Sequence, residues 1–570
     1  LQDPRTKRFN FDPHLLNIPS IDDFRFDTVP GFIPSGKDET LADIATELNT
    51  TKANSVKYYS STSSMTSVLK HFHTLLSKSK HINTSQFSKA FPESASVAPS
   101  MNLPSSSIVS PRGTSSSEIF YSIDSDKTGD MELVLSLLGH ELELFFTTPP
   151  DEFKQHLHST FSNSSEPPPD VNVASCYNYA KISKFLMRSQ LDARHPDLPN
   201  KGTFDIKTRA VAAIRYDIHH THFHPTDYSI VRTHGLFESF EREMFDCARS
   251  TLLKYQLQAR IGNMDGIFIA LHNVKKVFGF YYLSLDEIDH IIQGYSESMA
   301  ELGKEYKSVD KCLEELDNIV DDFGSHYQTK REHLSVYMAD FEFKSSMKIW
   351  EDLLDHIDTL VKGRPFRLIT RYEGKHLDDH IEVIVNVLDD ESLKLLTNTT
   401  DKVDEIVKEN ELSLKDDHEL LLTPTDRIQH SSKNLHKLSR NLWEVNNKIF
   451  QSTKNETYLF AITADHYING KKSTTSHPEP PTSIIDPGTK DRWEIKYSLK
   501  QVTDMGYIKR RYKKFIKSLR CLGGEISVLP KFEDGEAESR LYLDTTANIK
   551  QRILRAYSAK NQKRELTNFN

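Results

Sequence analysis

Apolar residues along the chain follow two spacings, one typical of helices and one typical of strands. They recur every three or four positions in Thr62–Ser77, Leu133–Phe146 and Gly235–Arg260, which predicts three amphipathic helices. They alternate with polar residues, or run together, in segments that predict strands at 185–194, 203–211, 266–271, 277–283, 366–372, 380–387, 457–468 and 493–502. Helices and strands interspersed in this way predict a mixed α/β fold.

Two of these strands, 185–194 and 203–211, flank a turn at His195–Gly202 that contains two prolines, an asparagine and a glycine. Successive side chains of a strand point to opposite faces, so Asp205 and Lys207 share one face and their apolar neighbours take the other. If the two strands pair as a hairpin, Asp192 near the end of the first comes close to Asp205 near the start of the second. Two carboxylates and an ammonium group suit a divalent cation and a phosphate.

The helix predicted at 133–146 offers a third carboxylate. Its apolar residues share one side of the helical wheel; Glu141 falls at the margin of that side, whereas Glu143 points nearly opposite. A carboxylate on the packed side of a helix needs a partner, because an unpaired buried charge is costly. Glu141 is therefore the preferred ligand and Glu143 the fallback. The structural alternative for Glu141 is a flanking acid with a solvated head.

The order of Asp192, then Asp205-Ile206-Lys207 on the next strand, resembles the signature of the PD-(D/E)XK nuclease superfamily. The resemblance implies a PD-(D/E)XK nuclease-like mixed sheet flanked by helices, with helical and α+β additions. It also implies Mg²⁺, with Mn²⁺ as the alternative, held by Glu141, Asp192, Asp205 and the backbone carbonyl of Ile206. Lys207 would position the attacking water or stabilise developing charge.

Further substrate contacts are expected on the helix at 235–260. Tyr255 and Gln258 are three positions apart and share a face near its end. The pair resembles the Gln/Tyr motif of RecB-like and lambda-exonuclease-like nucleases, although no Tyr follows Gln258 four residues later. Gln258 thus joins the catalytic set by resemblance, and an exposed amide at a helix end is the alternative. Arg209, on the strand face of Asp205 and Lys207, could steer a phosphate.

A narrower resemblance covers most of the chain and rests on the segments 59–66 (YSSTSSMT), 121–127 (YSIDSDK) and 260–266 (RIGNMDG) taken together. It is to the fungal mitochondrial Pet-type factors for RNA 5′-end processing and degradation. It implies a 5′-to-3′ exoribonuclease that acts on mitochondrial RNA. It also implies a location in the matrix or at the inner membrane, and the mitochondrial RNA polymerase or the RNA-degradation machinery as partners. No targeting segment can be read from a chain that begins at Leu1, so the location rests on the resemblance alone.

Two other function classes stay open. A non-catalytic RNA-binding regulator associated with the mitochondrial RNA polymerase would keep a nuclease fold without its activity, but the presence of Asp192, Asp205 and Lys207 together speaks against it. A DNA repair nuclease would differ only in its substrate, because the chemistry of these residues does not distinguish RNA from DNA.

Composition limits these alternatives. The 570 residues carry 72 basic and 81 acidic side chains, a net charge of −9, which excludes a nucleic-acid coat but allows local basic tracks. The four cysteines are widely scattered without metal-type spacing, which indicates reduced thiols. No apolar run approaches the roughly 20 residues that a spanning helix requires, so any membrane contact is expected to be peripheral.

The chain is long for one domain, so several regions are expected. The predicted division is an N-terminal strap and helix (1–117), a nuclease core (118–290), a helical region (291–365), an α+β accessory region (366–502) and a basic C-terminal segment (503–570).

The C-terminal segment contains a concentrated basic stretch. Seven of the fourteen residues in Tyr507–Arg520 are basic, with aromatic residues between them. Such a helix suits single-stranded RNA, because cations neutralise phosphates and aromatic rings stack on bases. An anionic membrane surface or an acidic protein is the alternative partner. The residues expected to contact RNA are Lys509, Arg510, Arg511, Lys513 and Lys514.

A histidine-rich segment follows the second strand of the hairpin. His219, His220, His222 and His224 could bind zinc, since imidazole is a common ligand. A short loop without a nearby cysteine cannot easily aim four rings at one ion, so a loop beside the substrate groove is preferred.

Overall fold

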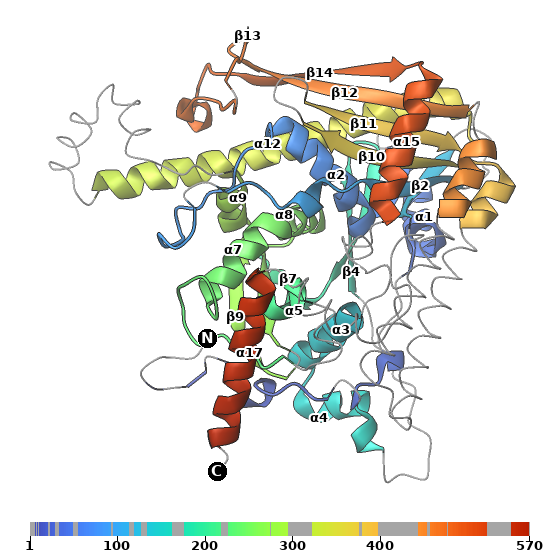
Figure 1. Ribbon diagram of the computed structural model, residues 1–570. Coiled ribbons are helices and arrows are strands. Elements are labelled where there is room, and N and C mark those ends of the chain that lie inside the picture. The colour runs from blue at the N-terminus through green and yellow to red at the C-terminus, as the bar shows by residue number, and fades with distance from the viewer. Residues whose placement is uncertain are drawn as a thin grey trace.

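Two β-sheets carry the fold in the computed structural model of the protein (Figure 1). The structure describes residues 6–396, 443–520 and 549–568, apart from gaps within the first two ranges, of which the longest are 113–118, 127–133, 162–175, 218–225 and 294–321. In the part of the chain so described, ten strands form one sheet and four form the other, and helices flank both. The predicted mixed α/β class is confirmed.

The ten-stranded sheet, called the large sheet, is built from distant parts of the sequence. Its strands run in the order β13 (Lys471–Lys472), β12 (Thr457–Ile468), β11 (His380–Val387), β10 (Phe366–Glu373), β2 (Ser105–Arg112), β3 (Phe120–Ser125), β1 (Tyr58–Ser61), β5 (Phe185–Leu191) and β4 (Cys176–Ile182), and β14 (Trp493–Val502) pairs with β12. Strands β3, β1 and β5 are parallel at its centre, whereas β10 joins β2 in antiparallel register. Three of the predicted regions, 1–117, 118–290 and 366–502, therefore share one sheet.

The four-stranded sheet, called the small sheet, contains the hairpin predicted to carry the site. Its strands run in the order β6 (Ala193–Arg194), β7 (Thr203–Ala210), β8 (Gly266–His272) and β9 (Val277–Ser284). Strand β6 pairs with β7 in antiparallel fashion, as predicted, and β7 runs parallel to β8. The prediction of one continuous strand at 185–194 is wrong, because the chain leaves the large sheet after β5 and enters the small sheet at β6.

The break between β5 and β6 has a local cause at Asp192. Its Oδ2 atom accepts a hydrogen bond of 2.8 Å from the backbone N–H of Ile206. The side chain thereby satisfies a backbone donor of β7 that a continuous neighbouring strand would otherwise pair. The residue that ends the strand is thus the one that the sequence marks as a candidate ligand.

Helix α2 (Thr62–Leu76) packs on the large sheet together with the long α12 (Asp322–Val361), as Figure 1 shows. Phe72 of α2 and Trp350 of α12 stack with their ring centroids 6.4 Å apart, and Trp350 also contacts Phe185 of β5. All three side chains are fully buried, so this contact lies in the main core. The helix predicted at 62–77 is confirmed, as is the one at 133–146, which is α3 (Val134–Thr147).

The single helix predicted at 235–260 is instead two, α7 (Phe240–Ser250) and α8 (Leu252–Gly262). Thr251 separates them with φ near −129°, and its N–H bonds to the carbonyl of Cys247, which ends α7. The Thr251 hydroxyl accepts a hydrogen bond of 3.2 Å from Arg209 of β7. Apolar spacing continues across the break, because both helices pack on the same core, and so it gave no sign of the interruption.

The N-terminal segment lies as a strap against α3. Phe24 is buried in a cluster with Leu138, Leu142 and Phe145 of that helix, and its ring lies 6.4 Å from that of Phe153. Aromatic side chains bury a large area at little conformational cost, which explains how a segment with little regular structure is held in place.

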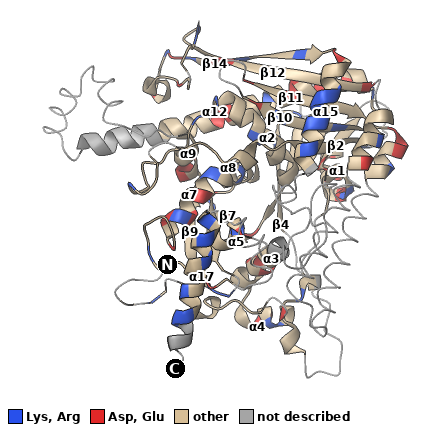
Figure 2. Ribbon diagram, viewed as in Figure 1, with Lys and Arg blue, Asp and Glu red and all other residues tan. Residues whose placement is uncertain are grey.

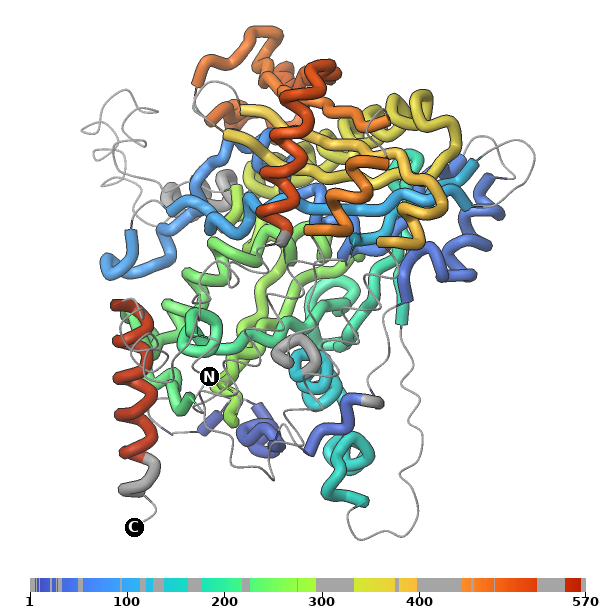
Figure 3. The backbone as a smooth tube through the Cα atoms, turned by 45° about the vertical axis from the view of Figure 1, so that its right-hand side comes forward, coloured from blue at the N-terminus to red at the C-terminus, as the bar shows by residue number. Residues whose placement is uncertain are grey.

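The remaining helices complete the cover of both sheets. None of the helices that the structure describes is both long and apolar enough to cross a membrane. The remaining helices include α1 (Glu39–Asn49), α4 (Pro150–Phe153), α5 (Ala212–Tyr216), α9 (Leu285–Gln293), α15 (Met505–Arg520) and α17 (Ile549–Asn568). Figure 3 and Figure 1 both show α15 across the large sheet and α17 beside the half that contains the small sheet.

Candidate active site

The predicted acidic residues and lysine of the hairpin lie together in the structure. The ammonium of Lys207 is 2.6 Å from Oδ2 of Asp205, and both residues project from the same face of β7. Asp192 reaches the same strand through its hydrogen bond to Ile206. We call these three side chains the DDK cluster (Asp192, Asp205 and Lys207). The turn between β6 and β7 brings the cluster together because it folds position 192 back onto positions 205 and 206.

The DDK cluster is strongly coupled electrostatically. Burial raises the pKa of Asp192 well above its usual value, and the neighbouring charge of Asp205 raises it further, while Lys207 opposes the shift. Burial alone would lower the pKa of Lys207, but Asp205 and Asp192 outweigh it and the pKa is raised. Ionisation of both carboxylates beside one ammonium group would leave an excess of negative charge, which a divalent cation would compensate.

The donor set of the cluster fits a hard cation. Carboxylate oxygens are the ligands that Mg²⁺ and Mn²⁺ prefer, and Asp192 and Asp205 supply them beside the partly buried Lys207. In the described ranges, no three His, Cys, Asp or Glu side chains are already arranged as a set of metal ligands. A third carboxylate would therefore have to move toward the cluster, or water would complete the coordination, as Mg²⁺ commonly allows.

Helix α3 places its two glutamates as the helical wheel predicts, with Glu141 on the packed side, so the alternative of a solvated head for Glu141 is wrong. Glu141 is fully buried, whereas the Glu143 side chain is 24% exposed and lies 3.2 Å from His140. The charge of Glu143 contributes to the raised pKa of both Asp192 and Lys207. The structure thus provides an electrostatic argument for Glu143, although the ligand role of either residue stays a prediction.

Packing of α3 on β7 explains this placement. A Cβ atom at Gly139 would lie 3.0 Å from Oγ1 of Thr208, so this glycine allows the helix to approach the strand. Glu143 is one helical turn beyond Gly139 and shares its face. The apolar side of α3 packs on the strap instead, which the wheel could not indicate. A glycine four positions before an acid is the signal in the sequence that could have favoured Glu143.

Helix α8 covers the face of β7 that carries the cluster. The ammonium of Lys207 is 5.9 Å from the centre of the Tyr255 ring, and burial raises the pKa of that tyrosine. Oε1 of Gln258 is buried and has no hydrogen-bond partner among the described residues. The alternative of an exposed amide at the helix end is therefore wrong for Gln258, and its carbonyl oxygen is available to a hydrogen-bond donor.

Arg209 lies on the predicted face of β7 but contacts protein groups. Its guanidinium donates to the hydroxyls of Thr251, at 3.2 Å, and Ser250, at 3.5 Å. These contacts tie the junction of α7 and α8 to the strand that carries Asp205. Since Arg209 is only 5% exposed, the structure supports a positioning role, and a contact with RNA stays a prediction.

The predicted RNA-binding helix is α15, and some of its cations are already paired. Arg511 forms ion pairs with Glu382 and with Glu373, the latter at 2.7 Å, and Lys514 lies 3.2 Å from Glu373. Lys509, Arg510 and Lys513 are exposed on the outer side. Figure 2 shows that α15 lies on the large sheet, whereas β7 and its DDK cluster belong to the small sheet. A contact of α15 with RNA stays a prediction.

Three segments that support the family resemblance meet around β5. Residues 59–66 form the end of β1 and the start of α2, and residues 121–125 form most of β3. Strand β1 pairs with β5 on one side and with β3 on the other. Residues 260–266 connect α8 to β8, and Asn178 of β4 donates to the carbonyl of Gly262 at 2.9 Å. The histidines at 219–224 lie outside the described residues.

The fold and site define an α/β protein with an Asp-Asp-Lys cluster on a strand pair between helices. Residues 32–355, more than half of the chain, match the family described as mitochondrial protein Pet127, and the chain belongs to this family. The Pet-type resemblance and the mitochondrial assignment are confirmed at the level of the family.

Two relatives agree with this membership. The "Putative mitochondrial translation system component PET127" of Saccharomyces cerevisiae is 40% identical over 382 residues, which cover 64% of this chain and 44% of the relative. The "mRNA degradation protein pet127, mitochondrial" of Schizosaccharomyces pombe is 34% identical over 322 residues, or 55% of this chain and 58% of the relative. The chain spans about half the length of the curated relatives it matches.

Proposed function

We propose that the protein is a metal-dependent nuclease of the PD-(D/E)XK type that acts on mitochondrial RNA. The DDK cluster supports this proposal, because two carboxylates coupled to a buried lysine are costly in a folded protein and suit phosphodiester hydrolysis. The name of the fission yeast relative, an mRNA degradation protein, supports RNA as the substrate. Attack from the 5′ end rests on the resemblance of the sequence.

In this mechanism Asp192, Asp205 and a glutamate of α3 hold the metal. Mg²⁺ or Mn²⁺ bound there would supply an activated water molecule and would neutralise charge on the phosphate. Lys207 keeps its proton, since its pKa is raised, and its ammonium stabilises the negative charge that develops in the transition state. Tyr255 shields this ammonium from solvent, and the buried Oε1 of Gln258 can accept a hydrogen bond from a sugar hydroxyl or from a water molecule at the phosphate.

Incubation with end-labelled RNA and DNA, each with a 5′-phosphate or a 5′-hydroxyl, tests the proposal in Mg²⁺ and in EDTA. We expect degradation of RNA in Mg²⁺ and none in EDTA. Release of labelled mononucleotides from the 5′ end would support an exonuclease, and internal fragments an endonuclease. Binding of RNA without degradation in Mg²⁺ and in Mn²⁺ would favour the non-catalytic regulator, and preferential degradation of DNA would favour a repair nuclease.

The two glutamates of α3 give a paired prediction. Glu143→Gln is expected to raise the Mg²⁺ concentration needed for half-maximal hydrolysis by about tenfold or more, because the charge of Glu143 already acts on Asp192 and Lys207. Glu141→Gln, a change of the same size in the same helix, is the matched variant. A larger effect of Glu141→Gln would restore the original ranking, and two silent variants would place the third ligand elsewhere.

The raised pKa of Asp192 predicts how stability depends on pH in the absence of metal. Between its ordinary pKa and the raised one, the folded state binds more protons than the unfolded state, so this group destabilises the fold as pH rises. Asp192→Asn mimics the protonated form. In EDTA we expect this variant to gain stability relative to wild type from pH 4 to pH 8, measured by urea unfolding. Saturating Mg²⁺ should reduce or reverse the difference, and a difference independent of pH would contradict the assignment.

A further inference from the structure

The last helix of the chain, α17, is fixed to the half of the molecule that contains the small sheet. Arg555 pairs with Asp217 through two contacts of 2.6 and 3.1 Å. The hydroxyl of Ser558 accepts a bond of 2.9 Å from the backbone N–H of Asp227. One turn further along, Asn561 donates to Glu238 at 3.1 Å. Since Ser558 and Asn561 are buried, these contacts define an inner side of the helix.

The anchor of α17 connects directly to the strand that carries the DDK cluster. Helix α5 begins at Ala212, two residues after the end of β7. Its last residue, Tyr216, accepts a bond of 2.9 Å at its carbonyl from Gln551, and the ammonium of Lys550 is 3.2 Å from the centre of its ring. A ligand held on α17 is therefore held in a fixed relation to Asp205 and Lys207.

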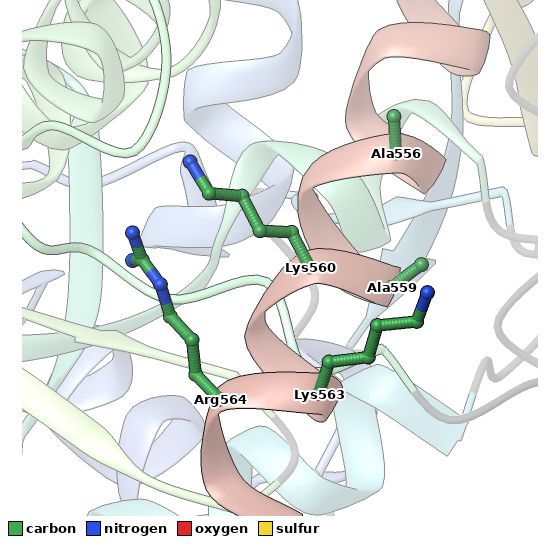
Figure 4. A pocket seen from close by; sticks show the side chains of 5 residues that line it. All are labelled: Ala556, Ala559, Lys560, Lys563 and Arg564. Carbon is green, nitrogen blue, oxygen red and sulfur yellow. The ribbon is translucent and has the colours of Figure 1, made fainter. Parts of the chain in front are cut away.

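The outer side of α17 carries exposed cations around a hollow. A cavity of about 470 Å³ is lined by Ala556, Ala559, Lys560, Lys563 and Arg564, which we call the cationic groove. Figure 4 shows Lys560 and Arg564 extending to one side of the helix and Lys563 to the other. The two alanines leave space close to the helix backbone. The groove is therefore shallow at the two alanines and is bordered by three positively charged side chains.

We propose that the cationic groove binds the phosphate backbone of single-stranded RNA. Lysine and arginine are the usual partners of phosphates, and three of them around small side chains fit a chain of phosphates better than a flat base. Among the described residues, the lining contains neither a carboxylate, which would repel the strand, nor an aromatic ring on which a base could stack. The proposal rests on the proposed function, and it concerns residues beyond the 32–355 that match the family.

The position of the groove distinguishes it from α15. Four of the five cations expected on α15 to contact RNA are exposed, but Lys514 lies 3.2 Å from Glu373, and Arg511 pairs with Glu373 and Glu382. Figure 2 shows α15 on the large sheet and α17 along the other half of the molecule. An anionic lipid surface is the competing ligand for any cationic helix. Of the described residues that line the groove, two alanines are the apolar ones, and such small side chains offer little for insertion into a membrane.

Binding measured in EDTA tests the groove without hydrolysis. Fluorescent single-stranded RNA is titrated with the full chain across a range of salt concentrations. The variants are wild type, Lys560→Gln/Lys563→Gln/Arg564→Gln and a control with the same loss of charge, Lys471→Gln/Lys490→Gln/Lys500→Gln. The control lysines are exposed on and near β13 and β14 of the large sheet.

The groove variant should weaken binding on the order of 100-fold at 0.1 M salt, and its log–log salt slope should be flatter by about 2, because each lost phosphate contact on a single strand contributes about 0.7. The control should bind like wild type. A second groove variant, Ala556→Glu/Ala559→Glu, keeps all three cations but adds carboxylates. It should weaken binding as well, and unfolding curves should match wild type for all variants.

Three results would contradict the proposal that the cationic groove binds RNA. The first is an unchanged salt slope of RNA binding in both groove variants, and the second is an equal loss of RNA affinity in the control variant. The third comes from the same titration with phosphatidylserine-containing vesicles: if the groove variants lose affinity for the vesicles but not for RNA, the helix binds a membrane. The nuclease proposal fails or succeeds separately. If wild type hydrolyses RNA but the groove variants bind it equally well, the proposal for the groove alone is wrong. If RNA binding depends on the groove but wild type does not hydrolyse RNA in Mg²⁺, the nuclease proposal alone is wrong.

Discussion

Asp205→Asn and Lys207→Ala are each expected to lower the rate of RNA hydrolysis by about two to three orders of magnitude, comparable to removal of one stabilising group from an active site. Asp205→Asn removes a charged ligand, and Lys207→Ala removes the ammonium that lies 2.6 Å from it. Single-turnover kinetics at saturating Mg²⁺ and RNA measure this loss. Asp197→Asn and Lys201→Ala make the same chemical changes at exposed positions in the turn between β6 and β7, and should act like wild type.

Loss of activity has to be separated from loss of folding in this experiment. Asp205 is buried, so its variant should be compared with wild type by thermal unfolding in EDTA and in Mg²⁺. A variant that melts normally in EDTA, but is no longer stabilised by Mg²⁺, would support a role as metal ligand. Hydrolysis at the wild-type rate by folded Asp205→Asn or Lys207→Ala would remove the DDK cluster from the mechanism.

Arg367→Met is expected to lower the free energy of unfolding by about 3–5 kcal/mol, the usual cost of leaving one partner of a buried ion pair behind. The guanidinium of Arg367 lies 2.5 Å from Oδ2 of Asp126 and donates to Ser106 and Asn446. Both members of the ion pair are almost completely buried. The contact joins β10 of the accessory region to residues near β2 and β3, so its loss should destabilise the large sheet.

A surface pair beside it provides the matched control. Arg364 pairs with Glu456 at 2.7 Å, but both side chains are nearly half exposed. Arg364→Met should therefore change the free energy of unfolding by less than about 1 kcal/mol. Urea unfolding measures both variants. Equal effects would contradict the argument from burial, and an unfolding curve of Arg367→Met in which only the accessory region unfolds early would show that the two parts of the sheet are only weakly coupled.

Local pattern in the sequence predicted the centre of the site. Alternation across 203–210 places Asp205 and Lys207 on one face of a strand, because the side-chain period of a strand is two residues. Proline, asparagine and glycine between 195 and 202 predict the turn that returns Asp192 to this strand. Both inferences involve residues close in sequence, where the geometry of the backbone leaves few alternatives.

The sequence by itself determined the mixed α/β class, the helices at 62–77 and 133–146, and the strand face shared by Asp205 and Lys207. Only the tertiary structure decided which surfaces meet. It placed Glu143 where its charge acts on Asp192 and Lys207, broke one predicted helix at Thr251, and joined Arg555 to Asp217 across 338 positions. Periodicity reports that a side is buried, but not what buries it, because the partner surface comes from a distant part of the chain.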